Sequence, residues 1–179
     1  IDTEGYRTFA SVNNLLLKED FKNQYEFILA LINSKIMNWF YANSFSNNSQ
    51  LTVNISKTFL EKLPIIDFNT DEAENLRKIV NYTLISKRYE ETAASIFFER
   101  LINAIVYQLY LPDEVHRANC DVVRYLNSLP QLKEGEDENT IKINLKTIQK
   151  VYKEFSDQKH PVSLAMFKMD TIEEIAIIE

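Results

Sequence analysis

Amide, hydroxyl and aromatic side chains crowd one stretch of this sequence that holds almost no acid. No Asp or Glu occurs between Glu26 and Glu61, although the whole chain has 26 acidic residues against 20 basic ones. Carboxylates repel phosphates, whereas Asn and Gln amides offer the donor and acceptor pair that complements adenine in the major groove. The stretch from Ala30 to Ile65 is therefore a candidate nucleic-acid-binding face.

Each polar or aromatic residue of this stretch is assigned a contact by its chemistry. Lys35 and Lys57 would neutralise phosphates, and hydroxyls such as that of Ser44 would contact the phosphate backbone. Tyr41 or Phe45 would stack on an exposed or flipped base. The predicted DNA-binding residues are Lys35, Asn38, Tyr41, Asn43, Ser44, Asn47, Asn48, Gln50 and Lys57.

A structural role explains the same composition as simply. Asn and Ser are frequent in loops because their side chains bond the backbone of turns. Trp39 and Phe40 are of a type that is more often found in a core than in a base-stacking platform. Asn33 or Ser34 would then bond backbone groups of a neighbouring segment. The sequence leaves both interpretations open.

No set of residues with a catalytic pattern is found in the chain. His116 and Cys120 lie four residues apart and would share a helix face, but two ligands do not make a zinc site. Asp113 and Asp157 superficially echo a metal-dependent nuclease, yet the sequence between them looks helical and that chemistry needs adjacent strands. GxGxxG, P-loop and GxSxG motifs are absent. We expect no catalytic and no metal-binding residues, so this chain alone is not expected to be an enzyme.

Length and composition predict one domain, or one domain with an appendage, for the 179 residues. Only two Gly and four Pro are present, which favours long helices. The single cysteine, Cys120, excludes an internal disulfide and suits a reducing compartment such as the cytoplasm. No apolar run is long enough for a membrane span. Because residue 1 is Ile, we expect a piece of a longer protein.

The charge is distributed unevenly along the chain. Residues 1–62 carry six basic and six acidic residues and sum to zero, whereas residues 63–179 carry fourteen basic and twenty acidic residues and hold the whole net charge of −6. We expect the C-terminal part to repel phosphates and the N-terminal part to permit them.

Short strands and one apolar helix are predicted to position the candidate face. Residues 6–18 predict two short strands. Apolar residues then recur at helical spacing over residues 22–42, on most sides of the helix, which predicts packing in the middle of the domain. Residues 43–50 have the composition of a loop, and residues 51–55 alternate as a short strand.

The second part of the chain is predicted to be helical. Two apolar stripes at 71–88 and 90–110 indicate either a helical hairpin or one long interrupted helix. Residues 121–129 predict a short helix, and residues 133–140 are charged and form the best linker candidate. Residues 141–155 predict a clear amphipathic helix, and the last ten residues fit a helix or an edge strand.

The predicted fold class is α+β, with a small mixed or antiparallel sheet around a central helix, followed by a helical section. The expected organisation is an α+β recognition part at 1–68, a helical hairpin section at 69–130, and a linker with a C-terminal helix and tail at 131–179.

Several motifs of the first part resemble a known family. Ala30-Leu31-Ile32-Asn33-Ser34-Lys35, the aromatic Trp39-Phe40-Tyr41 and the late Leu63-Pro64-Ile65 resemble the TaqI-like C-terminal specificity domain. This domain is the target-recognition part of type IIG restriction-modification enzymes and adenine-specific DNA methyltransferases. Val106-Tyr107-Gln108-Leu109-Tyr110 resembles the helix that commonly follows it, so the resemblance covers roughly residues 6–116.

The resemblance implies a bacterial protein that reads a short sequence in double-stranded DNA and presents the target adenine to a separate catalytic domain. The partners it implies are that DNA and the methyltransferase or nuclease domains of the same polypeptide. S-adenosylmethionine and Mg are expected only in those missing catalytic domains, because this chain has no Asn/Asp-Pro-Pro-aromatic motif.

A protein-interaction module is the alternative. The helices predicted at 71–88 and 90–110 would dock onto a catalytic domain or partner subunit without DNA contact, and their acidic surroundings favour this role over phosphate binding.

Overall fold

The structure, a computed structural model, describes residues 16–45, 61–66 and 70–179. These residues form helices and connecting segments, and no strand occurs among them. The elements are η1 (Glu19–Gln24), α1 (Tyr25–Asn33), α2 (Lys35–Phe45), α4 (Thr70–Arg88), α5 (Thr92–Tyr110), α6 (Pro112–Arg117), η2 (Val123–Tyr125), α7 (Glu138–Phe155), α8 (Pro161–Met169) and α9 (Glu173–Ile178).

The predicted α+β class is therefore wrong, because this structure is all-helical. The strand predicted at 51–55 and most of the segment 6–18 lie outside the described residues, and residues 16–18 are irregular. The physical reason is that helices, and not a sheet, cover the apolar sides of α1 and α2: α1 packs on α4 and α5, and α2 packs on α5 and α9.

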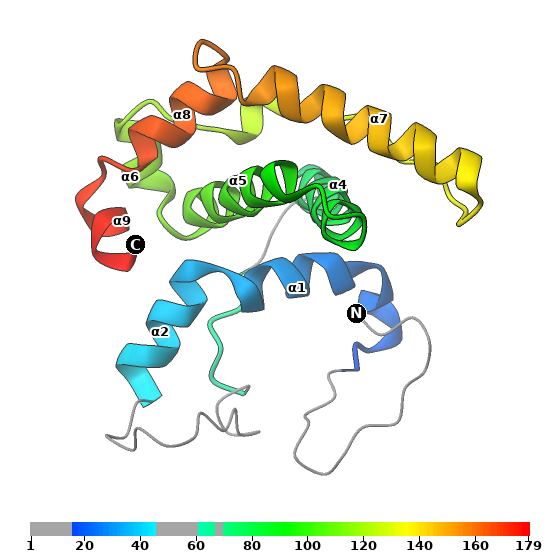
Figure 1. Cartoon of the computed structure of the whole chain (residues 1–179). Coiled ribbons are helices and arrows are strands. Elements are labelled where there is room, and N and C mark those ends of the chain that lie inside the picture. Colours follow the sequence, from blue (N-terminus) through cyan, green and yellow to red (C-terminus); the bar gives the residue numbers. More distant parts are fainter. Residues whose placement is uncertain (1–15, 46–60, 67–69) are drawn as a thin grey trace.

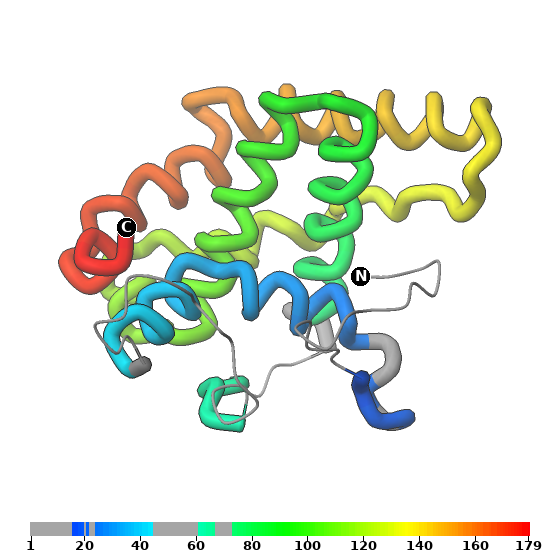
Figure 2. The backbone as a smooth tube through the Cα atoms, turned by 60° about the horizontal axis from the view of Figure 1, so that its bottom comes forward, coloured from blue at the N-terminus to red at the C-terminus, as the bar shows by residue number. Residues whose placement is uncertain are grey.

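The helices are stacked in three layers (Figure 1). The hairpin of α4 and α5 forms the middle layer, with α1 and α2 on one side and α7 and α8 on the other. Figure 2 shows α1 crossing the two hairpin helices, which run side by side, while α2 continues past α5. The short helices α6 and α9 close one end, where α6 packs on α5 and α9 packs on α2.

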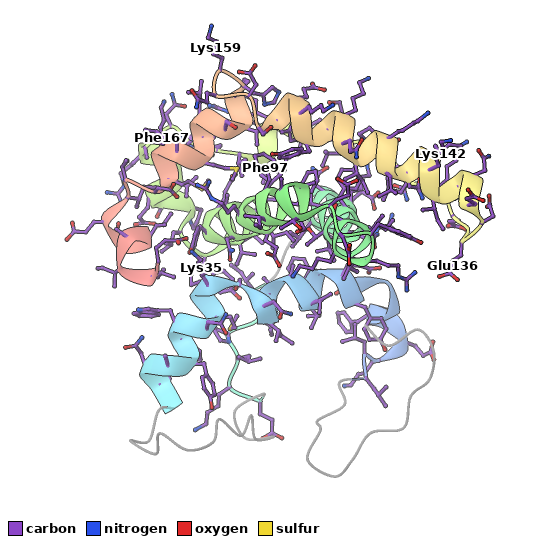
Figure 3. The ribbon with its side chains drawn as sticks, in the orientation of Figure 1. Lys35, Phe97, Glu136, Lys142, Lys159 and Phe167 are labelled. Atoms are coloured by element: carbon purple, nitrogen blue, oxygen red, sulfur yellow. The ribbon has the colours of Figure 1, made fainter. Side chains whose placement is uncertain are left out.

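The middle layer supplies much of the core because it is covered from both sides. Phe98, Leu101 and Ile105 of α5 are fully buried, as are Leu76 and Ile79 of α4. Phe97 of α5 reaches the outer layer, where its ring meets that of Tyr152 of α7 edge to face at a centroid distance of 5.7 Å (Figure 3). Aromatic pairs of this geometry add to the area buried and hold the layers together.

The chain between α4 and α5 reverses direction without a glycine. Glu90 takes the left-handed conformation, with φ of 58°, and the Glu91 N–H donates to the Ser86 carbonyl at 2.8 Å. A glycine at this left-handed position would have indicated the end of α4 in the sequence. The sequence therefore left a hairpin and an interrupted helix open, and the structure decides for the hairpin.

The helix predicted over 22–42 is broken at Ser34. Ser34 has an extended ψ of 154°, its hydroxyl donates to the Leu31 carbonyl at 2.7 Å, and its oxygen accepts from the Met37 N–H at 3.3 Å. One side chain thus ends α1 and caps α2. From α5, the Asn103 Oδ1 accepts the Lys35 N–H at 2.9 Å, which ties the beginning of α2 to the middle layer.

Other predicted elements have mixed outcomes. The helix at 141–155 is confirmed as part of α7, and the tail forms the helix α9. The helix predicted at 121–129 is wrong, since only the 3₁₀ turn η2 forms there. α8 was not predicted, although it has a recognisable beginning: the His160 Nδ1 accepts from the Val162 N–H at 3.2 Å, and Pro161 is the first helical residue.

Among the described residues, no helix combines the length and the hydropathy that crossing a bilayer would take.

Candidate nucleic-acid interface

The outward side of α2 carries an amide–aromatic face made of Asn38, Trp39, Ala42 and Asn43. All four residues are exposed, and at 3.6 residues per turn they fall on one side of the helix. The opposite side holds the buried Met37 and the partly buried Phe40. The four residues of the amide–aromatic face are uncharged, in line with the acid-free composition of the segment, and Lys35 lies on the same side of α2 about one turn earlier.

Asn43 keeps hydrogen-bonding capacity on this face. Its Nδ2 donates to the Trp39 carbonyl at 2.8 Å, one turn earlier, which takes one of its two N–H donors. The other N–H and the Oδ1 are left for an adenine edge, which needs one donor and one acceptor from the amide. The internal bond holds the amide close to the Trp39 position.

Trp39 lies on the surface and not in the core. We expected a core tryptophan, but its side chain is 39% exposed. The sequence contains a pattern that indicates this position: Trp39 lies four residues before Asn43 and one after Asn38, so a helical wheel puts the three residues on one side of the helix. Tryptophan offers a large flat ring on which a base can stack.

Tyr41 and Ser44 do not join this face. By the helical pitch they lie about 130° and 170° around α2 from its middle. Tyr41 is partly buried, and Ser44 is exposed on another side of the helix. Among the predicted residues that the structure describes, Lys35, Asn38 and Asn43 share this side of α2, with Lys35 about one turn before Asn38. Asn47, Asn48, Gln50 and Lys57 lie outside the described residues.

Lys35 is paired within the molecule. Its ammonium forms an ion pair with the Glu179 carboxylate beyond α9, and Figure 3 shows it between α2 and the middle layer. The other oxygen of that carboxylate, Oε1, accepts from the Tyr107 hydroxyl at 2.9 Å. Burial first, and then the bond to Glu179, raises the pKa of Tyr107, so its hydroxyl remains a donor.

These side chains line a cavity of about 360 Å³ between α2, α5, α8 and α9. Arg100 and Asp170 lie on the same cavity and form a second ion pair, at 3.2 Å. Opposite charges thus balance one another around the cavity, and the cluster holds α2 against the rest of the molecule. The amide–aromatic face is carried on a helix whose base is fixed at several points.

His116 and Cys120 do not share a helix face. α6 ends at Arg117, His116 is exposed, and Cys120 is fully buried with its Sγ donating to the Val115 carbonyl at 3.4 Å. Burial raises the pKa of Cys120, so the thiol stays protonated. Within the described ranges, no three His, Cys, Asp or Glu residues gather as metal ligands would.

Comparison with known proteins places the resemblance on the first third of the chain. Residues 1–65 match the family model of the TaqI-like C-terminal specificity domain. The matched range contains α1 and α2 and ends before α4, so the resemblance is confirmed there, while the helix at 106–110 lies outside it. This family is a specificity domain and not a catalytic one. No curated protein and no solved structure matches the chain.

Proposed function

We propose that this chain reads a short DNA sequence as the recognition part of a bacterial restriction-modification enzyme or adenine-specific DNA methyltransferase, in the cytoplasm. The observation that carries the proposal is the match of residues 1–65 to the TaqI-like C-terminal specificity domain. Recognition would position the target base for a catalytic domain elsewhere in the same polypeptide, and S-adenosylmethionine and Mg would be bound there.

The amide–aromatic face of α2 is the proposed reading surface within the described residues. Asn38 and Asn43 supply the amides that pair with base edges, and Trp39 supplies the ring for a splayed or flipped base. Reading by hydrogen bonds needs a support that does not move. The Ser34 cap, the Asn103 bond and the Lys35–Glu179 ion pair give α2 such a support.

This surface is suited to sequence selectivity more than to high binding affinity. The acid-free segment from Phe27 to Leu60 has only two lysines, Lys35 and Lys57, and the Lys35 ammonium is paired with Glu179. Affinity for a duplex comes mainly from phosphates neutralised by free cations. Asn47, Asn48, Gln50 and Lys57 follow α2 in the chain and remain proposed DNA contacts.

The test compares Trp39→Ala with Phe167→Ala in the intact protein. Both residues are exposed aromatics, but Phe167 lies on α8, across the hairpin from α2, and is 71% exposed. Loss of a stacking ring weakens binding by about 1–3 kcal/mol, or roughly five- to 150-fold. Selection from a randomised duplex pool, followed by binding of the selected sequence, should show that loss for Trp39→Ala and none for Phe167→Ala.

The double variant Asn38→Ala/Asn43→Ala should keep the affinity for random duplexes and flatten the sequence preference, because amides read bases and do not neutralise phosphates. Unchanged preference in both this variant and Trp39→Ala would remove the face from DNA recognition.

One observation favours the docking alternative. A groove of about 470 Å³ between α1, α4 and α5 is lined partly by Leu84 and Ile96, which are 40% and 54% exposed. The remaining faces of the hairpin are largely covered by the two outer layers. If Ile96→Asp abolished activity of the intact protein while the α2 variants kept it, docking at this groove would be the better explanation.

A further inference from the structure

The outer side of α7 carries a row of four lysines, Lys142, Lys146, Lys150 and Lys153. They repeat at intervals of four, four and three residues, so they fall within about 80° of the helix circumference. All four are exposed, whereas Ile148, Val151 and Phe155 on the other side of α7 are buried. We call this surface the α7 lysine row.

The lysine row lies in an acid-free window that is more cationic than the window containing α2. No acid occurs between Glu138 and Glu154, and this window holds four lysines, whereas the longer window between Glu26 and Glu61 holds two. α7 therefore has a net charge of +2, from four lysines and two glutamates, in a chain whose net charge is −6. The prediction that the C-terminal part repels phosphates throughout does not describe this helix.

The four ammonium groups have no partner among the described residues. The ion pairs of the described residues join other cations, and none of them includes a lysine of the row. Unpaired cations attract counterions whose release favours binding of a polyanion. The four lysines can therefore bind phosphates without the loss of an internal ion pair, whereas Lys35 would first have to leave Glu179.

Its length suits the backbone of a duplex. Lys142 and Lys153 are separated by about 16 Å along the helix axis, at 1.5 Å per residue. Each DNA strand places a phosphate every 3.4 Å of duplex axis, so a surface of this length spans enough phosphates of the two strands for each of the four lysines to contact one.

The surroundings of the row disfavour other anionic surfaces. Protein interfaces are depleted in lysine and depend on buried aromatic or apolar anchors. The polar Asn139 and Gln149 lie beside the lysines on this side of α7, and the nearest apolar residue, Ile143, is partly buried. The apolar side of α7 is packed against α4, α5 and α8, so it is not available to a membrane.

We propose that the α7 lysine row binds the phosphate backbone of double-stranded DNA without regard to sequence, as a second contact surface separate from α2. Figure 3 shows Lys142 on α7 and Lys159 beyond its end, on the side of the molecule away from α1 and α2. A straight duplex read by α2 does not reach that side. The row therefore holds another stretch of duplex, and this role deepens, and rests on, the proposed function.

The experiment replaces the row in the intact protein by Lys142→Gln/Lys146→Gln/Lys150→Gln/Lys153→Gln, since Gln keeps good helix propensity. A random-sequence duplex is titrated at several KCl concentrations. The slope of log K against log [KCl] should flatten by up to about 3.6, which is 0.9 for each of four lost phosphate contacts. The sequence preference read by α2 should stay as in the wild type.

A matched control removes the same charge from scattered, internally paired cations: Lys78→Gln/Lys87→Gln/Arg88→Gln/Arg117→Gln. It should leave the slope near that of the wild type. An equal flattening in the control would overturn the inference, because net charge and not the row would then matter. Binding of polyglutamate or of anionic vesicles as tight as that of the duplex, lost together with it in the row variant, would overturn the assignment to DNA.

The two proposals fail separately. If the α2 variants leave the sequence preference unchanged but the row variant flattens the salt slope, the proposal that α2 reads the sequence is rejected and the proposal that the row binds the backbone is supported. If the α2 variants abolish the sequence preference and the row variant behaves as the wild type, the row has no role in DNA binding.

Discussion

At the scale of single residues, Asn103 connects the candidate interface to the middle of the molecule. Its Oδ1 accepts the Lys35 N–H at 2.9 Å, and its Nδ2 donates to the Glu99 carbonyl at 3.1 Å. The acceptor satisfies one of the N–H groups that the beginning of α2 leaves without a helical partner. One amide thus orients the helix that carries Asn38, Trp39 and Asn43.

This role predicts an order of stabilities for two replacements. Asn103→Asp keeps an acceptor and sets a negative charge at the positive end of α2, so it should retain most of the stability. Asn103→Leu removes the acceptor and should lower the free energy of unfolding by about 1–2 kcal/mol. Urea unfolding measures both, and equal stabilities of the Leu and Asp variants would show that the bond does not hold α2.

At the scale of elements, the beginning of α7 is determined by its N-cap residue, Asp137. The Asp137 carboxylate accepts from the Asn139 and Thr140 N–H groups at 3.1 and 3.0 Å. The pKa of Asp137 is held below its usual value by the hydrogen bonds that its carboxylate accepts, first from the Thr140 side chain, then from the Thr140 N–H and the Asn139 N–H. The cap fixes where the helix that carries the lysine row begins.

The lowered pKa predicts a pH dependence with a definite sign. A carboxyl whose pKa is lower in the folded state stabilises fully above its unfolded pKa of about 3.9, and this contribution disappears as the pH falls through the lower folded pKa. Asn is also a good cap but does not titrate. The wild type should therefore lose melting temperature relative to Asp137→Asn between pH 6 and pH 3, as thermal unfolding at both values can show; a constant difference would exclude the cap.

At the scale of the whole molecule, the layers share one core. Phe98 of α5 is fully buried and meets the Tyr82 ring at a centroid distance of 5.4 Å, and α5 contacts both outer layers. This arrangement argues that the parts expected at 1–68, 69–130 and 131–179 unfold together. Trp39, the single tryptophan, reports on α2 alone, while far-ultraviolet circular dichroism reports on all helices.

Two-state unfolding is therefore expected, with coincident transitions of Trp39 fluorescence and circular dichroism in urea. Phe98→Ala should shift both transitions together and cost about 3–5 kcal/mol. Phe167→Ala should shift neither by much, because that ring is 71% exposed. If the fluorescence transition stays in place while the circular dichroism moves, α2 belongs to a unit that folds independently.

Local patterns were enough for several features of the fold. The apolar stripes of the hairpin and of α7 recur every three or four residues, so they are visible in the sequence. The predicted fold class was wrong because the apolar sides of α1 and α2 are covered by helices, and the apolar pattern of a helix does not show whether a sheet or other helices pack on it. The break at Ser34 was hidden because the apolar pattern continues across it, and Asn103, which accepts the N–H of the next residue, is 68 positions from Lys35.

The sequence by itself determined the acid-free window, the motifs of a specificity domain, the two apolar stripes of α4 and α5 and the spacing of the α7 lysines, because each depends on residues close together in the chain. Only the tertiary structure decided that Lys35 pairs with Glu179, that Trp39 faces outward, and that the lysine row lies across the middle layer from α2. Ion pairing and burial depend on which distant segments meet. Lys35 and Glu179 are 144 positions apart, and no local periodicity carries that information.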